Sequence, residues 1–251
     1  MPRILLLGDS LTFHGPAQPL PLTDPRLFPN VMADALAGEV DVVARLGWTT
    51  RDAWWAMTKD PRVWSVLLPA ADALVVTVGG MDHLPAAVPT YLREGIAYVR
   101  PGWLRRGVRS AYRTTSPHVI RASGGRMRQL PQAATDHYLT RIVGGARHYR
   151  PDLPVVVTAP SPYDAHVYPS QRHHPSAVAA ARRWGAHHDV PVVDLDPLVR
   201  PGLDAGENNP DGMHWGWRTH QAVGVALADA LRALGVDGVA PTHTRDGDAA
   251  E

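Results

Sequence analysis

Short apolar runs of strand length alternate with longer amphipathic segments along most of the chain. Five runs are expected to form buried strands, over Arg3 to Gly8, Asp41 to Arg45, Ala73 to Val78, Pro154 to Ala159 and Val190 to Asp194. The apolar spacing between them predicts helices over Phe28 to Ala37, Val88 to Val99, Thr135 to Tyr149, Ser176 to His188 and Arg218 to Leu234. Strands that alternate with helices form parallel sheets with helices on both faces. The sequence therefore predicts an α/β fold with a five-stranded, doubly wound parallel sheet.

The chain is long enough for one sizeable domain. Its 251 residues fit a single α/β unit, which we expect to span residues 1–235 because the last predicted helix stops at Gly235. Asp237 to Glu251 is polar and interrupted by glycine and proline. Residues 236–251 are therefore expected to form a disordered tail.

An arginine-rich stretch interrupts the alternation of strands and helices. Gly95 to Thr135 contains no acidic residue. Its eight arginines are Arg100, Arg105, Arg106, Arg109, Arg113, Arg121, Arg126 and Arg128. We expect about residues 100–133 to be an insertion in the domain. Insertions of this length are either lids over a functional site or mobile segments, and the sequence favours neither.

Composition excludes several function classes. The formal net charge is +1, from 25 basic and 24 acidic side chains, so no global field points to nucleic acid or an anionic membrane. The chain has no cysteine, which excludes disulfides, thiolate metal sites and a cysteine nucleophile. No apolar run approaches the ~20 residues of a membrane span, and Met1 to Ser10 lacks signal-peptide features. We therefore expect a cytoplasmic protein, and its oligomeric state stays open.

The motif Gly8-Asp9-Ser10-Leu11-Thr12 directly follows the first predicted strand. Ligands bind beyond the carboxyl ends of parallel strands, so a serine there is placed to react. The alternative is a serine that caps a helix after a Gly-Asp turn, and five residues alone favour that alternative.

A second motif, Asn209-Pro210-Asp211-Gly212-Met213-His214, precedes the last predicted helix. A serine hydroxyl needs a base that removes its proton, and the imidazole of that base needs an acceptor on its other nitrogen. Three-residue spacing in a tight turn allows Asp211 to reach the His214 ring. Alone, the pair is more typical of a turn and a surface histidine. Combined with Ser10 at the opposite end of the chain, it favours a catalytic triad.

Together the two motifs resemble the first and last sequence blocks of the GDSL/SGNH hydrolase superfamily. The resemblance implies a three-layer, flavodoxin-like fold and a triad of Ser10, His214 and Asp211. The mid-chain Gly-x-Ser-x-Gly motif of ordinary α/β-hydrolases is absent.

Two further blocks of the superfamily supply its oxyanion hole. Gly47 matches the glycine of the second block, whose backbone N–H binds the oxyanion, although a turn glycine is an alternative. The third block is normally Gly-x-Asn-Asp, and here it reads Gly79-Gly80-Met81-Asp82. A thioether donates no hydrogen bond, so the usual asparagine donor is missing. We expect the backbone N–H groups of Ser10, Gly47, Gly80 and Met81 to form the hole.

Additional segments narrow the resemblance to acyltransferases of methylglucose lipopolysaccharide biosynthesis. These segments include Asp24-Pro25-Arg26, Gly47-Trp48-Thr49, Asp60-Pro61-Arg62, Gly79 to Asp82 and Asn209 to Trp215. The likeness implies transfer of an octanoyl group from octanoyl-CoA to a sugar hydroxyl of diglucosylglycerate, with acyl-CoA as substrate and no cofactor. A carbohydrate or lipid esterase with water as acceptor is the first alternative, and a non-catalytic glycolipid- or acyl-binding module is the second.

Candidate substrate-binding residues are Asp9, Trp48, Arg51, Asp82, Trp215, Arg105 and Arg106. Tryptophans beside the motifs can exclude water or stack on a sugar, although any one of them is equally expected in the core. Asp82 and Arg51 either orient substrate or support neighbouring loops. Arginines of the insertion can hold coenzyme A phosphates or a glycerate carboxylate. His173, His174, His187, His188 and His220 are expected on the surface, and no metal site is predicted.

Overall fold

The sheet of the computed structural model is parallel throughout, with the strand order β2-β1-β3-β4-β5. The structure describes residues 1–238. The strands are β1 (Arg3–Gly8), β2 (Glu39–Ala44), β3 (Ala73–Val76), β4 (Val155–Thr158) and β5 (Val192–Val193). All five predicted strands are confirmed, each within a few residues of its expected bounds. The order reverses between β1 and β3, and ligands of flavodoxin-like sheets bind at such a reversal.

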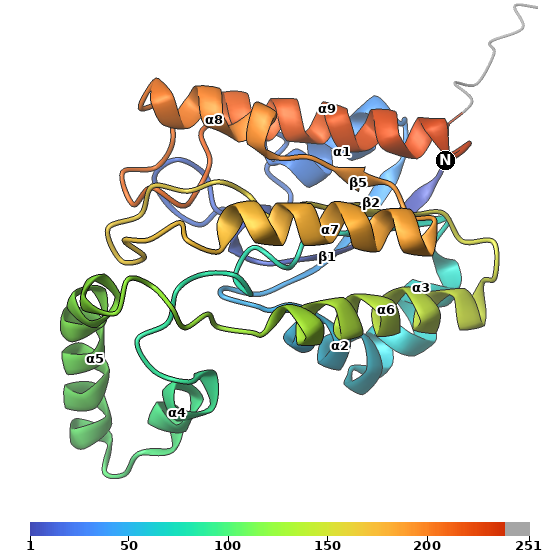
Figure 1. Cartoon of the computed structure of the whole chain (residues 1–251). Coiled ribbons are helices and arrows are strands. Elements are labelled where there is room, and N and C mark those ends of the chain that lie inside the picture. Colours follow the sequence, from blue (N-terminus) through green and yellow to red (C-terminus); the bar gives the residue numbers. More distant parts are fainter. Residues whose placement is uncertain (239–251) are drawn as a thin grey trace, which may run out of the picture.

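Helices cover both faces of the sheet, which makes three layers (Figure 1). One face carries α1 (Phe28–Ala35), α8 (Asp196–Asp204) and α9 (Trp217–Ala233). The other face carries α2 (Thr50–Lys59), α3 (Leu68–Ala70), α6 (Gln132–Tyr149) and α7 (His174–His188). Alternate residues of β1 serve the two faces: Ile4 and Leu6 pack against α1 and α9, whereas Leu5 and Leu7 pack against α2 and α6.

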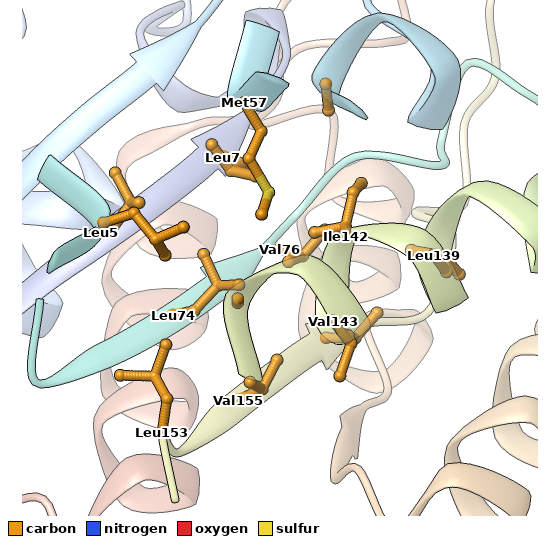
Figure 2. Close-up of a cluster of buried hydrophobic side chains, with 14 of the residues drawn as sticks. Leu5, Leu7, Met57, Leu74, Val76, Leu139, Ile142, Val143, Leu153 and Val155 are labelled. Carbon is orange, nitrogen blue, oxygen red and sulfur yellow. The ribbon is translucent and has the colours of Figure 1, made fainter. Parts of the chain in front are cut away.

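Figure 2 shows the core on the α2 and α6 face. Met57 of α2 and Ile142 of α6 point toward Leu7 and Val76 of the sheet, and all four side chains are at most 1% exposed. Burying an aliphatic side chain of this size contributes about 1.5–3 kcal/mol relative to leaving it exposed. This packing holds the strands in register, so their carboxyl ends form a fixed platform.

The helices differ from the predicted set in two respects. The helix expected over Val88 to Val99 is shorter: α4 (Thr90–Gly95) begins after Pro89 and passes into a 3-10 turn over Ile96–Tyr98. Helices α2, α3 and α8 were not predicted. For α2 the sequence did carry a signal, because Thr49 and Asp52 form a reciprocal capping box at its start.

The arginine-rich stretch contains a helix of 21 residues, α5 (Gly102–Ala122). Figure 1 shows α4 and α5 standing apart from the three layers, beyond the carboxyl ends of the strands. Backbone hydrogen bonds from Gln129 to Leu84 and from Ala86 to Met127 tie the end of this stretch to the loop after β3. The stretch is therefore anchored to the loop that contains the predicted third block.

The end of the predicted domain lies slightly beyond Gly235. Val236 is buried in the α9 face of the core, and the Gly238 N–H donates a hydrogen bond to the Leu36 carbonyl. Residues 236–238 of the predicted tail are thus packed on the domain, and residues 239–251 lie outside the described residues. Within residues 1–238, no helix combines the length and apolar character needed to cross a membrane.

Candidate active site

Ser10 begins a short 3-10 turn directly after β1. Asp9, not Ser10, caps this turn, because its carboxylate accepts a hydrogen bond from the Leu11 N–H at 3.0 Å. A Cβ at Gly8 would lie 2.0 Å from the hydroxyl oxygen of buried Thr12, so a larger residue at the end of the strand would have to displace the Thr12 side chain. The capping alternative for Ser10 is therefore wrong, and its hydroxyl is free for another partner.

Backbone and side-chain hydrogen bonds shape the loop that contains Asp211 and His214. The Asn209 side chain accepts from the Asp211 N–H at 2.9 Å, and Asp211 accepts in turn from the His214 N–H at 3.0 Å. Gly212 has a φ of +72°, and a Cβ there would lie 1.9 Å from the Asp164 carbonyl oxygen. Another residue at Gly212 would both strain the turn and displace the neighbouring loop.

These two segments bring three side chains into one hydrogen-bonded chain. The distance from His214 Nδ1 to Asp211 Oδ2 is 2.6 Å, and that from His214 Nε2 to Ser10 Oγ is 2.9 Å. Nδ1–H therefore donates to the carboxylate, and Nε2 is left to accept the proton of the serine hydroxyl. This is the geometry that activates a serine nucleophile.

Burial sets the protonation of the pair. It lowers the pKa of His214, and the hydrogen bond and charge of Asp211 offset this only in part. Burial also raises the pKa of Asp211, but hydrogen bonds from the His214 backbone and ring and from the Met213 N–H outweigh it and lower that pKa overall. At neutral pH the arrangement holds a neutral imidazole beside a carboxylate, as a general base requires.

Two further histidines adjoin the candidate base, and the sequence did not identify either as part of the site. The His14 ring stacks on the His214 ring with centroids 3.7 Å apart and an interplanar angle of 15°. His220 Nε2 lies 3.2 Å from the His14 carbonyl oxygen, and His220 Nδ1 accepts from the Phe28 N–H at 3.2 Å. The prediction that His220 lies on the surface is wrong, since it is 0% exposed. It falls on the apolar stripe of α9 with Val223, a signal that the sequence already contained.

The stacking of His14 on His214 predicts an effect on the pH profile of kcat/KM. Activity needs neutral His214, whose pKa is lowered from the ordinary value of about 6.5, so the acidic limb of kcat/KM should have its midpoint below 6.5. His14 contributes to that lowering, because a positive charge at this distance disfavours a second one. His14→Phe keeps a ring and removes the charge, so it should move the midpoint to higher pH. A pH profile of kcat/KM measures this, with His137→Phe on exposed α6 surface as the control. An unchanged or lower midpoint for His14→Phe would refute this role for His14.

The loops after β1, β2 and β3 meet beside Ser10. A Cβ on Gly80 would lie 3.7 Å from the Asp9 carboxylate, and Asp82 binds the start of α2 through Thr50. Among the residues that the structure describes, no backbone hydrogen bond uses the N–H groups of Ser10, Gly47, Gly80 or Met81. These four N–H groups, which the sequence predicts to form the oxyanion hole, therefore have no backbone acceptor in the described part of the chain. The Met81 side chain instead packs against Leu84 and Tyr163.

Asp82 supports these loops and does not face a ligand. It is 0% exposed, and its carboxylate accepts from the Thr50 N–H at 3.0 Å, the Thr50 hydroxyl at 2.6 Å and the Thr135 hydroxyl at 2.9 Å. The prediction of direct substrate binding by Asp82 is therefore corrected to loop support. Burial also raises its pKa, with the hydrogen bonds opposing that effect.

This role has a measurable consequence for stability. Asp82→Ala leaves one buried N–H and two hydroxyl groups without their acceptor, which should lower the free energy of unfolding by about 2–4 kcal/mol. Urea denaturation measures the change, and Asp34→Ala on the exposed side of α1 is the control, with an expected change within about 0.5 kcal/mol. Unchanged stability for Asp82→Ala would contradict the supporting role.

The remaining predicted substrate-binding residues lie in different surroundings. Trp215 is 1% exposed, packs against Phe28 and donates its indole N–H to Ser161, so it belongs to the core and offers no stacking face. Asp9 is also buried, as the cap of the Ser10 turn, and burial raises its pKa to about 7. Trp48 packs partly against the core on the α2 face. Direct contact with substrate is therefore corrected for Trp215 and Asp9.

A cavity of about 1040 Å³ lies between α2, α4 and α5. The three arginines predicted to bind substrate differ in whether they line it. Arg51 lines this cavity, where it pairs with Glu94 and lies over the Trp55 ring at 4.7 Å. Arg105 and Arg106 do not line it. Arg109 and Arg113, one and two turns further along α5 than Arg105, do so instead.

The histidine pairs show no metal-binding arrangement. Among residues 1–238, no group of three or more histidine and acidic side chains is placed to hold an ion. His187 is exposed, as expected. His174 is buried at 5% exposure beside His83 and Tyr163, so its predicted surface position is wrong.

The sequence matches known proteins over nearly all of its length. The model of the "GDSL-like Lipase/Acylhydrolase family" matches residues 6–222. A protein of Mycobacterium tuberculosis named "Diglucosylglycerate octanoyltransferase" is 43% identical over 240 residues, which cover 94% of each chain. A protein of Mycolicibacterium hassiacum with the same name is 43% identical over 236 residues, covering 94% of this chain and 97% of the relative.

Solved structures show the same fold at low sequence identity. The lipase/acylhydrolase from Enterococcus faecalis has a TM-score of 0.61 at 19% identity, covering 93% of this chain and 96% of that one. A carbohydrate acetylesterase family member from Sinorhizobium meliloti has a TM-score of 0.58 at 16% identity, and the match covers 93% of this chain and 99% of that one. The three-layer arrangement is thus shared with esterases and lipases.

Proposed function

The chain belongs to the GDSL-like lipase/acylhydrolase family and is an acyl-transferring enzyme, and on this premise we propose that it transfers an octanoyl group from octanoyl-CoA to a sugar hydroxyl of diglucosylglycerate. The observation that supports the chemistry is the hydrogen-bonded chain from Asp211 through His214 to Ser10. The substrates come from the names of the two relatives and from the resemblance of the sequence motifs. The same resemblance motivates a place in methylglucose lipopolysaccharide biosynthesis.

The first half-reaction forms an acyl-enzyme. Ser10 Oγ attacks the thioester carbonyl carbon while its proton passes to His214 Nε2, 2.9 Å away. The resulting imidazolium is stabilised by Asp211, which holds Nδ1–H at 2.6 Å. When the carbon–sulfur bond breaks, His214 returns the proton to the leaving thiolate. Coenzyme A leaves as the free thiol, and Ser10 carries the octanoyl ester.

The second half-reaction transfers the group to the acceptor. A sugar hydroxyl attacks the ester carbonyl, and His214 takes its proton. As the bond to Ser10 Oγ breaks, His214 returns that proton to the serine. The free enzyme and an octanoylated sugar result, with every proton accounted for at Nε2.

The oxyanion of both steps is held by backbone N–H groups in this proposal. Gly47, Gly80, Met81 and Ser10 supply N–H groups that no backbone partner within residues 1–238 occupies. Loss of one donor costs about 10²–10³ in kcat where the others are retained, and Met81 replaces a side-chain donor of the family. A slower chemical step than that of an asparagine-bearing hydrolase is therefore expected.

Hydrolysis is the competing function, favoured by the fold shared with esterases. The reaction products distinguish hydrolysis from transfer. Wild-type protein and a Ser10→Ala variant are each incubated with octanoyl-CoA, in the presence and in the absence of diglucosylglycerate. Mass spectrometry then identifies the products. Serine-dependent octanoylation of the sugar is the expected result. Serine-dependent free octanoate with unmodified sugar would make this enzyme a hydrolase, and the transferase proposal would fail.

A further inference from the structure

The cavity between α2, α4 and α5 adjoins the catalytic edge of the sheet without containing the triad. Leu46, which lines the cavity, directly precedes Gly47, the glycine proposed for the oxyanion hole. Tyr168, which also lines the cavity, packs against the cluster that contains Met81, as does Met213, the neighbour of His214. A molecule that fills the cavity therefore contacts residues that adjoin the loops of Gly47 and Met81.

Positive charge dominates the walls of this cavity. Four arginines line it, against two acidic side chains, Asp52 and Glu94. Both acidic side chains pair with Arg51. The remaining three arginines are Arg93, Arg109 and Arg113, and none of them forms an ion pair within the described part of the chain. Arg93 donates to the neutral amide of Gln129.

Two details favour a ligand with oxygen acceptors. The Nε–H of Arg51 is buried and has no acceptor among residues 1–238, although buried donors are normally paired. Arg109 and Arg113 are exposed side chains one helical turn apart on α5, so their guanidinium groups can converge on one anionic group. Apart from Ser116, the other lining residues are apolar or aromatic and include Trp55, Ile96 and Tyr112.

We propose that this cavity is a substrate subsite in which Arg93, Arg109 and Arg113 bind an anionic group while the apolar and aromatic walls contact the neutral part of the same molecule. The inference rests on the proposed transfer reaction, in which both substrates are anions. The anionic group is either the carboxylate of the glycerate acceptor or a phosphate of coenzyme A. Fork-shaped guanidinium groups suit both.

The test compares two double variants of the same helix. Arg109→Ala with Arg113→Ala removes two charges from the cavity, and Arg105→Ala with Arg106→Ala removes two charges that do not line it. Calorimetry measures binding of free coenzyme A and of diglucosylglycerate to the whole protein and to both variants. Each ligand is measured alone, so no acyl transfer occurs and the result does not depend on whether the proposed reaction takes place. Circular dichroism confirms that each variant is folded.

We expect the Arg109 and Arg113 variant to weaken one of the two ligands about tenfold to a hundredfold, and the Arg105 and Arg106 variant to weaken it less than about twofold. Loss confined to coenzyme A identifies a phosphate, and loss confined to diglucosylglycerate identifies the carboxylate. Equal losses in the two variants would indicate a general charge effect and overturn the proposal. The proposal would also be overturned if the Arg109 and Arg113 variant bound both ligands as tightly as the wild-type protein does.

Discussion

Ser10→Ala is expected to lower kcat for acyl transfer by about 10⁴–10⁶-fold, the range in which serine triads fail without their nucleophile. The loss follows from the geometry: His214 Nε2 has Ser10 Oγ as its partner at 2.9 Å, and no second hydroxyl among residues 1–238 is hydrogen-bonded to that nitrogen. Substrate binding should persist, because the change removes one oxygen atom from a largely buried position. Single-turnover kinetics with octanoyl-CoA measures the effect.

Ser110→Ala is the matched control, since it removes the same atom from an exposed position on α5. It should retain wild-type kcat. A Ser10→Ala enzyme that kept more than about a tenth of wild-type kcat would show that the acyl group does not pass through Ser10, because triad serines contribute orders of magnitude more.

Asp211→Asn should lower kcat by about 10³–10⁴-fold at neutral pH. The Asp211 carboxylate accepts the His214 Nδ1–H at 2.6 Å, and an amide placed there can present a donor instead. His214 then favours the tautomer with its proton on Nε2, which cannot accept the proton of Ser10. The carboxylate charge that stabilises the imidazolium is lost in the same step.

Asp164→Asn supplies the comparison for this variant. Asp164 is exposed in the loop that contacts Gly212 through the backbone, so its substitution removes one negative charge beside the same turn. We expect near wild-type kcat for Asp164→Asn. Similar losses in the two variants would assign the effect of Asp211 to the local field and not to its hydrogen bond with His214.

Where the chain has strong local patterns, the sequence predicts the structure well. Ile4 to Leu7 are apolar on both faces of β1, and an uninterrupted run of that length fits a buried strand covered from both sides. Ser10 and the Asp211 to His214 turn were identified because each lies in a compact motif. The 2.9 Å contact between Ser10 Oγ and His214 Nε2 requires in addition that β1 and α9 belong to one domain.

Features that depend on contacts between distant segments were not predictable in this way. The His14 and His214 rings stack across 200 residues of chain, and neither residue's local pattern reports on the other. Helix α5 has an internal proline, Pro117, and its only buried residues are Ser116, Pro117 and Ile120, so its local sequence argues against a helix that packs on a core. Trp215 was placed at the site because it follows His214, but successive residues of a turn face different ways.

Formation of an acyl-enzyme on Ser10 is the central claim, and rapid-quench mass spectrometry of the intact protein with octanoyl-CoA tests it most directly. The account predicts that wild-type protein gains one octanoyl group, that digestion places it on the peptide containing Ser10, and that diglucosylglycerate removes it as octanoylated sugar accumulates. Ser10→Ala should gain nothing. Octanoylated sugar formed at the wild-type rate by Ser10→Ala, with no acylated protein at any time, would contradict the account.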